Sequence, residues 1–172
     1  MVRYIMCFLL LTGCLLVSGC GYQLANRPGG ASPLTGRTVA IQLFANKVYR
    51  PHLEAVLTRQ MVNEFALRSG GSVVSEEKAE LLIEGAVTGY TVAQIAYSAT
   101  DVSMQKRLTL TAESTLKDRK SQKILWKGTL SLFQDYPSVA DLALQQNAQD
   151  AALDEVCRRL AEGFYDRMSA AF

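Results

Sequence analysis

Residues 104–117 read MQKRLTLTAESTLK, and apolar and polar side chains alternate along this stretch. A period of two is typical of a β-strand that buries one face and exposes the other. The side chains expected to be buried are Leu108, Leu110, Ala112 and Leu116. The alternation resumes further along the chain with Ile124, Trp126, Leu130 and Leu132. Because the polar turn KDRKS (117–121) lies between them, the two segments predict an antiparallel hairpin with one apolar face.

Two more strands are predicted upstream of this hairpin. The segment TVAIQLF (38–44) alternates apolar side chains, and ELLIEGAVTGYTVAQIAY (80–97) is long enough to run the length of a sheet. In the longer strand Ile83 and Val87 are expected to point inward. The apolar phase changes near Gly89, which predicts a β-bulge there.

Two amphipathic helices complete the pattern. The first is expected to begin at Pro51, where a missing N–H costs nothing, and to end at Gly70-Gly71. Its apolar side chains are spaced four apart at Leu53, Leu57, Met61 and Phe65. The second helix is expected between Pro137 and the end of the chain, with Ser138 as a candidate N-cap and Asp141 three residues later as its partner in the cap. Its buried stripe is Ala152, Val156, Leu160, Phe164 and Met168.

The order strand, helix, three strands, helix defines the predicted fold class. A meander with a single apolar face needs a cover, and the two amphipathic helices can supply it. We therefore expect an α+β, two-layer sandwich, with two helices packed on one face of a mixed four-stranded sheet. The strand at 38–44 connects to the others through a helix, so it should lie parallel to its neighbour.

The N-terminus carries a processing signal instead of a fold pattern. Arg3 precedes an almost uncharged stretch from Tyr4 to Val17 that is shorter than a membrane-spanning helix, as in secretory signals. The residues VSGC (17–20) resemble a bacterial lipobox, in which the chain is cut before the cysteine and acyl chains are attached to Cys20. Several acyl chains, at about 0.8 kcal/mol per buried CH₂, make a stable membrane anchor. An ordinary secretory signal with a chance cysteine is the alternative.

These features divide the chain into three expected parts. Residues 1–19 form a lipoprotein signal peptide that is removed, residues 20–37 hold the lipidated Cys20 and a flexible tether, and residues 38–172 form a single periplasmic α/β domain. Loss of the signal leaves seventeen Lys and Arg against sixteen Asp and Glu, and we expect no nucleic-acid partner. Cys157 lies among apolar residues at helical spacing, which predicts a buried and unreactive thiol.

Residues that could carry catalysis or hold a metal are sparse. His52 is the single histidine, which leaves little for a metal cluster or a Ser-His-Asp triad, and it is expected on the surface. No glycine-rich phosphate-binding motif occurs. We therefore expect a protein that is not an enzyme and that needs no metal and no cofactor. A periplasmic hydrolase, with a carboxylate pair assembled only by the fold, is the alternative.

The strongest charge feature lies on the predicted hairpin. Between residues 104 and 127 seven basic residues accompany two acidic ones, a net charge of +5. Clusters of Lys and Arg bind phosphate through charge-assisted hydrogen bonds. In a second interpretation they only solubilise the sheet and protect its edge. The candidate partner-binding residues are Lys106, Arg107, Lys117, Arg119, Lys120, Lys123 and Lys127.

Several stretches, taken in order, resemble one known family. They are CGYQL at the lipobox, VAIQLFANKVYRPHLE, LTRQMVNEFALRSG, AELLIEGAVTGY and QQNAQDAALDEVCRRLAEGF. Together they are similar to the LptE family of lipopolysaccharide-assembly lipoproteins. The resemblance implies a non-enzymatic outer-membrane lipoprotein of a Gram-negative bacterium that plugs the LptD β-barrel. It also implies that the protein assists the assembly of that barrel and binds lipopolysaccharide on its way to the cell surface, with the domain on the periplasmic side within the barrel lumen.

A second class of lipoprotein shares part of this pattern. TVAIQLFAN and AELLIEGAVTG also resemble envelope lipoproteins of the LpoB and CsgG type, so a peptidoglycan-synthase activator is the alternative function. Those proteins usually carry longer tethers or membrane-inserting segments. The tether expected here covers only residues 23–37, which favours the barrel plug. In that role the seven basic residues would meet lipid A phosphates, core acids or acidic residues of the barrel.

Overall fold

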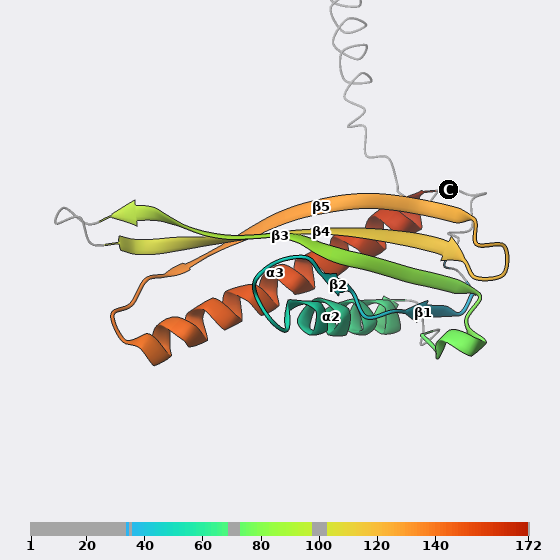
Figure 1. Ribbon diagram of the computed structural model, residues 1–172, viewed down its shortest axis with the longest axis horizontal. Coiled ribbons are helices and arrows are strands. Elements are labelled where there is room, and N and C mark those ends of the chain that lie inside the picture. The colour runs from blue at the N-terminus through green and yellow to red at the C-terminus, as the bar shows by residue number, and fades with distance from the viewer. Residues whose placement is uncertain (1–33, 35, 69–72, 98–102, 172) are drawn as a thin grey trace, which may run out of the picture. The chain divides into compact units, whose positions relative to one another are not determined.

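The computed structural model describes residues 34, 36–68, 73–97 and 103–171. The predicted signal peptide, Cys20 and the expected helix end at Gly70-Gly71 lie outside these described residues. The described chain forms two layers, a twisted sheet and two helices that cover one of its faces (Figure 1). The α+β sandwich expected from the sequence is therefore confirmed.

The sheet contains five strands in the described part of the chain. They are β1 (Val39–Ile41), β2 (Ala45–Asn46), β3 (Leu81–Tyr97), β4 (Ser103–Asp118) and β5 (Ile124–Pro137). The order is β1-β3-β4-β5, and β2 pairs with β3 beyond the end of β1. Both short strands run parallel to β3, whereas β3, β4 and β5 form an antiparallel meander. The mixed sheet and the parallel first strand are confirmed, and β2 is a fifth strand that the sequence did not predict.

Two irregularities in pairing decide which side chains reach the core. The register between β3 and β4 shifts between Val87 and Gly89, which confirms the predicted bulge. A second shift occurs in the β4–β5 pairing, where Leu116 lies opposite Trp126 but Lys117 lies opposite Ile124. This shift reverses the phase of the alternation, so Ile124 is 54% exposed and its predicted burial is wrong.

Two α-helices form the second layer. The helix α2 (Leu53–Arg68) buries the four side chains predicted for it. It begins two residues after Pro51, because His52 adopts a positive φ of 67° and its carbonyl accepts the first helical hydrogen bond, from Val56 N at 3.2 Å. The expected start at Pro51 is therefore wrong. A short 3₁₀ helix, η1 (Glu76–Lys78), connects to β3.

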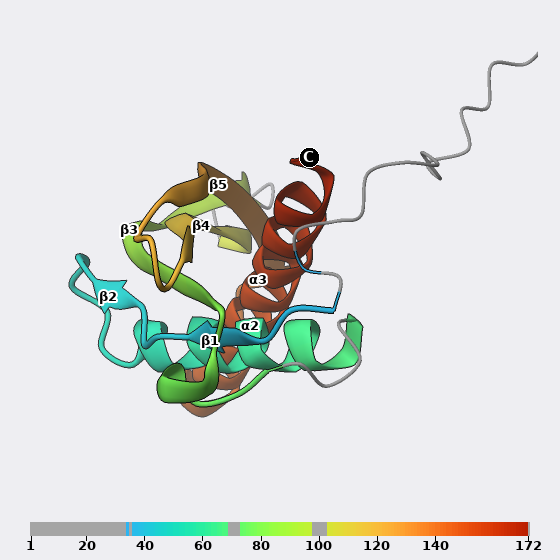
Figure 2. The same cartoon turned by 90° about the vertical axis from the view of Figure 1, so that its right-hand side faces the viewer.

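The helix α3 (Leu142–Ala170) covers β4 and β5 and lies beside α2 (Figure 2). All five predicted stripe residues are buried. Its N-cap is Asp141, whose side chain accepts a hydrogen bond from Leu144 N at 2.9 Å. The expected cap at Ser138 is wrong, because the helix begins four residues later and the side chain of Ser138 is too far from its first N–H groups.

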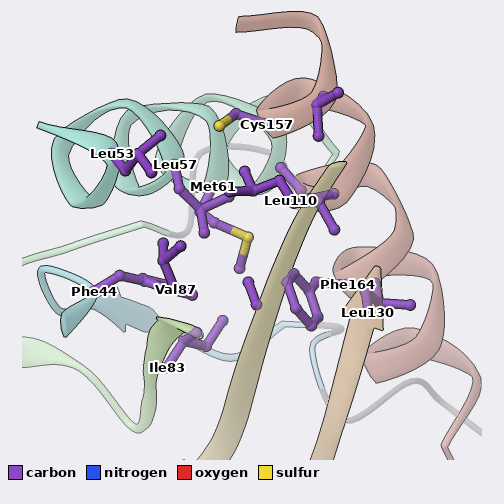
Figure 3. Close-up of a cluster of buried hydrophobic side chains, with 14 of the residues drawn as sticks. Phe44, Leu53, Leu57, Met61, Ile83, Val87, Leu110, Leu130, Cys157 and Phe164 are labelled. Atoms are coloured by element: carbon purple, nitrogen blue, oxygen red, sulfur yellow. The ribbon is translucent and has the colours of Figure 1, made fainter. Parts of the chain in front are cut away.

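The core lies between the sheet and the two helices (Figure 3). Phe44, Ile83 and Val87 approach from the sheet side and are at most 1% exposed. Side chains of α2 and α3, Phe164 among them, fill the other side of this layer, and the thiol of Cys157 lies between the two helices near Leu57. Burial of each large apolar side chain stabilises the folded state by about 1.5–3 kcal/mol. One continuous apolar layer therefore holds both helices on the sheet.

Candidate functional site

The β4–β5 hairpin carries all seven basic residues singled out in the sequence, but it separates them. Lys106 and Arg107 lie opposite Tyr136 and Asp135, at the end of the hairpin where β4 begins and β5 ends. Arg119, Lys120 and Lys123 lie in or beside the turn at the other end. At about 3.3 Å per residue, the two ends are about 40 Å apart along the strand. The candidate residues therefore do not form one patch.

Arg107 is engaged within the hairpin itself. Its Nε and Nη2 donate to the two carboxylate oxygens of Asp135 at 2.7 and 2.8 Å, and its guanidinium lies 4.0 Å from the ring centroid of Phe133. The hydrogen bond from Arg107 lowers the pKa of Asp135. Lys106 lies on the opposite face of the strand, as alternation requires. A new anion at this end would compete with Asp135 for Arg107.

The turn at the other end is held by Asp118. Its Oδ1 accepts hydrogen bonds from the backbone N and the Oγ of Ser121, both at 2.9 Å, and its Oδ2 accepts one from Arg37 at 2.8 Å. These bonds, those from Ser121 first, hold the pKa of Asp118 far below its usual range. Arg119 also points inward, since its Nε donates to the carbonyl of Ala79 at 2.6 Å.

Lys120 and Lys123 contrast with their neighbours in this turn. Both are exposed, and neither ammonium group has a hydrogen-bond or ion-pair partner among the residues that the structure describes, although the backbone of Lys123 pairs with Asp118 and Ser121. Their ammonium groups are therefore available to an external anion. An exposed lysine binds such an anion mainly as a point charge on a flexible stem.

The remaining cations lie over the sheet face that the helices leave open. Lys47, from the loop after β2, forms an ion pair with Glu113 on β4 at 2.7 Å. Lys117 forms an ion pair with Glu84 on β3. Lys127 on β5 lies near Glu113 without a direct bond in the described structure and helps to lower the pKa of that carboxylate, which the Lys47 hydrogen bond lowers most.

A groove of about 370 Å³ lies on that open face. Its wall combines Lys47, Lys127, Glu84 and Glu113 with apolar parts of Leu43 and of two alanines. Lys47 pairs with Glu113, and Lys117, which does not line the groove, pairs with Glu84, so Lys127 is the lysine of this wall without an ion pair among the described residues. Ammonium groups can donate to phosphate oxygens, and carboxylates can accept from sugar hydroxyls.

Lys47 is the residue of this groove that sequence reasoning missed. It lies in ANKVYRP, a segment predicted to be a loop, about sixty-six positions before its partner Glu113. The loop lies over the sheet because β2, just before it, pairs with Ala86 and Val87 of β3. No local pattern signals such a contact, because it depends on tertiary structure.

The groups that could carry covalent or acid–base chemistry are placed apart. Burial raises the pKa of the Cys157 thiol to about 12, which confirms the predicted buried cysteine and makes it a poor nucleophile. His52 is exposed, as expected. Within residues 34–171, apart from the undescribed gaps, no three His, Cys, Asp or Glu side chains are grouped to hold a metal ion.

Neither described helix combines the length and the apolar character needed to cross a bilayer. Each helix buries one apolar stripe in the core between the helices and the sheet. The acidic pair Glu76 and Glu77 lies exposed in η1.

Known proteins were compared with the chain at the level of sequence and of structure. None of the curated proteins searched matches it. Lipoprotein B from Nitrosomonas europaea has a TM-score of 0.55 at 12% identity, over 86% of this chain and 92% of that one. A lipoprotein from Caulobacter crescentus has a TM-score of 0.53 at 15% identity, over 73% and 87%. Rare lipoprotein B from Shewanella oneidensis has a TM-score of 0.50 at 14% identity, over 75% and 89%.

At these identities the solved structures show a shared fold and nothing more. The family model is more specific, because it matches residues 36–168 as one stretch. That stretch contains every strand and almost all of both helices of the sandwich. The chain therefore belongs to the LptE family, described as lipopolysaccharide-assembly.

Proposed function

We propose that the mature chain is an outer-membrane lipoprotein of a Gram-negative bacterium, anchored through acylated Cys20, that binds the LptD β-barrel. In this role it occupies the barrel lumen from the periplasmic side, assists barrel assembly and takes part in delivery of lipopolysaccharide to the surface. The observation that carries the proposal is the family match over residues 36–168. No step in this role requires the protein to act as an enzyme.

The surface of the sheet supports a role as a plug. On the face away from the helices, β4 and β5 present Thr111 and Ser131, whose hydroxyls lie 2.9 Å apart, and the ion pairs around Glu113. The interior of an outer-membrane barrel is polar. A sheet whose open face is polar can therefore pack against the wall of such a lumen, and its charged groups would not contact the hydrocarbon of the bilayer.

Binding to the barrel is tested by purification of the tagged chain from detergent-solubilised outer membranes. We expect a large β-barrel, identified by mass spectrometry as LptD, to remain bound. Recovery of a peptidoglycan synthase in its place would support the activator alternative and contradict the proposal. The N-terminal peptide should carry acyl chains on Cys20, and an unmodified N-terminus would contradict the anchor.

Lipopolysaccharide is proposed to contact the groove over the open face of the sheet. Lys127 is the cation left over after Lys47 and Lys117 have paired with glutamates. A phosphate of lipid A or of the core can accept hydrogen bonds from Lys127, while the hydroxyls of neighbouring sugars meet the carboxylates and Thr115, which also lines the groove. Arg107 and Arg119 are less suited, because their guanidinium groups are already bonded within the domain.

The substitution K127E tests this contact. It reverses the charge of the unpaired lysine of the groove, so affinity for purified lipopolysaccharide should fall about tenfold or more. The matched control is the double substitution K120E/K123E, which changes charge in the turn and not in the groove. If K127E binds as the unchanged protein does, or the control weakens binding more, the groove is not the contact.

A further inference from the structure

A second groove lies at the edge of the sheet, where β2 ends and the chain turns away toward α2. β2 and the loop after it lie beside β3 at this edge (Figure 2). Residues 47–50 of the loop form one wall of the groove, and residues 88–91 of β3 form the other. Its volume of about 500 Å³ lies within the range of about 300–1,000 Å³ that is usual for small-molecule sites.

The loop that forms the first wall is held in place by its own hydrogen bonds. The side chain of Asn46 accepts from Val48 N at 3.0 Å through Oδ1, and its Nδ2 donates to the carbonyl of Arg50 at 2.8 Å. The backbone N of Lys47 donates to the carbonyl of Val87 on β3 at 3.0 Å. Because these bonds fix the wall before any ligand arrives, a ligand does not have to order it.

The charges of this groove are already neutralised within the domain. Lys47 forms an ion pair with Glu113 at 2.7 Å, and the guanidinium of Arg50 forms one with Asp150 at 2.9 Å. An anionic ligand would have to compete with both carboxylates, whereas Lys127 in the neighbouring groove has no such pair among the described residues. The charge of the groove therefore favours a neutral ligand.

Two tyrosines give the groove flat aromatic surfaces. The hydroxyl of Tyr90 accepts a hydrogen bond from Gln149 on α3 at 2.6 Å, and the Arg50 guanidinium lies 6.0 Å from the centroid of its ring. These contacts fix the Tyr90 ring. Tyr49, in contrast, is fully exposed at the outer part of the loop. One ring is thus a rigid part of the wall, and the other is open to a ligand from the solvent.

The remaining side chains distinguish a sugar from a hydrocarbon chain. A sugar ring packs its C–H face on an aromatic ring, while its hydroxyls exchange hydrogen bonds with polar side chains. Thr91 offers a hydroxyl in this groove, and the paired carboxylates can accept further hydrogen bonds. An acyl chain would find only one aliphatic side chain in the wall, that of Val48. The chemistry of the lining therefore suits a neutral sugar.

We propose that this groove binds neutral sugar rings of the lipopolysaccharide core, with one ring stacked on Tyr49. The inference rests on the proposed function, which brings the glycolipid to the domain. Lys47 lines this groove and also the groove over the open face of the sheet. The two grooves adjoin at this residue, so one glycolipid can place a phosphate at Lys127 and a sugar ring at Tyr49.

Binding is measured with the full-length acylated protein in detergent micelles. The probe is core oligosaccharide that has been freed from lipid A and dephosphorylated. Saturation-transfer difference NMR identifies which sugar protons contact the protein, and a titration gives the affinity. The affinity should change little between about 50 mM and 500 mM salt, because the contact does not depend on charge.

The substitution Y49A should weaken this affinity about fivefold to tenfold, because it removes the stacking surface. Y49F keeps the ring and should bind as the wild type does. The matched control is L142A, which truncates another exposed apolar side chain, at the start of α3, and should leave the affinity unchanged.

No binding of the oligosaccharide, or equal affinities of Y49A and L142A, would overturn the proposal. Binding of lipid A alone that is weakened by Y49A would assign the groove to an acyl chain and would also overturn it. Equal affinity for a peptidoglycan disaccharide would contradict the choice of the lipopolysaccharide core. Because barrel binding and the K127E contact are measured separately, each of these results would leave the proposed function standing.

Discussion

Gly85 lies on β3 where the backbone of the neighbouring strand and a core ring leave no room for a side chain. A Cβ at this position would overlap the carbonyl oxygen of Glu113 and the ring of Phe44, which is 1% exposed. The G85A variant should therefore lose about 1–3 kcal/mol of unfolding free energy, the usual cost of overpacking.

Urea unfolding measures this loss, and G163A is the matched control. A Cβ at Gly163 in α3 meets only the end of the flexible Leu130 side chain, at 3.1 Å, and alanine favours a helix by up to about 1 kcal/mol. G163A should be as stable as the wild type or more so. A G85A variant as stable as G163A would show that the strand can move aside.

Asp118 should make stability depend on pH in the acid range. Its pKa in the folded protein lies far below the ordinary value, because it accepts hydrogen bonds from Ser121 and Arg37. A group of this kind stabilises the fold above its unfolded pKa, near 4, and the contribution is lost as the pH falls toward the folded value.

The D118N variant should therefore be less stable than the wild type at pH 6, and the difference should shrink as the pH falls from about 4 to 2. Denaturant unfolding at a series of pH values measures it. The R37Q variant should show a smaller loss, since the Ser121 hydrogen bonds to Asp118 remain. A stability difference between wild type and D118N that does not change with pH would contradict this role.

At the scale of single elements, the start of α3 offers a matched pair of substitutions. Asp141 caps the helix through its bond to Leu144 N, whereas Ser138 forms no cap. D141A should cost about 1 kcal/mol, within the 0.5–2 kcal/mol range of N-caps, and S138A should cost almost nothing. Amide hydrogen exchange near Leu144 measures this loss even if only the first turns of α3 unfold locally. Equal effects of the two substitutions would contradict the role of Asp141 as the N-cap.

Long elements could be predicted from the sequence because their periodicity is repeated many times. The inward residues of β4 and the four buried positions of α2 follow alternation and four-residue spacing without exception. Short elements could not. The two residues of β2 have no periodicity, and its existence depends on pairing with β3. The exposure of Ile124 depends on a register shift that local sequence does not reveal.

The candidate site was predictable in composition and not in arrangement. The sequence places seven basic residues close together along the chain, but a hairpin of this length carries them to two ends and one face of the sheet. Ion pairing then distinguishes them: Arg107 and Lys117 have acidic partners, and Lys120 and Lys123 have none among the described residues. Partners such as Glu84 come from other strands, so counting charge along the chain cannot identify the free cations.

At the scale of the whole molecule, the domain has a polar open sheet face and belongs to the LptE family, and the proposed lipid anchor would hold it at the membrane. The match over residues 36–168 places the domain in lipopolysaccharide assembly. The proposed tasks, docking in a barrel and holding a glycolipid, need surfaces and not reactive groups. A thiol with a pKa of about 12 and an exposed His52 are consistent with such a role.

The central claim is tested most directly in cells from which the protein can be depleted. Newly made lipopolysaccharide at the cell surface, labelled from outside the cell, should fall as the protein is lost. The wild-type chain should restore it, and a chain with Cys20 and the preceding signal replaced by those of a soluble periplasmic protein should restore it less. Unchanged delivery of lipopolysaccharide to the surface after depletion would contradict the account.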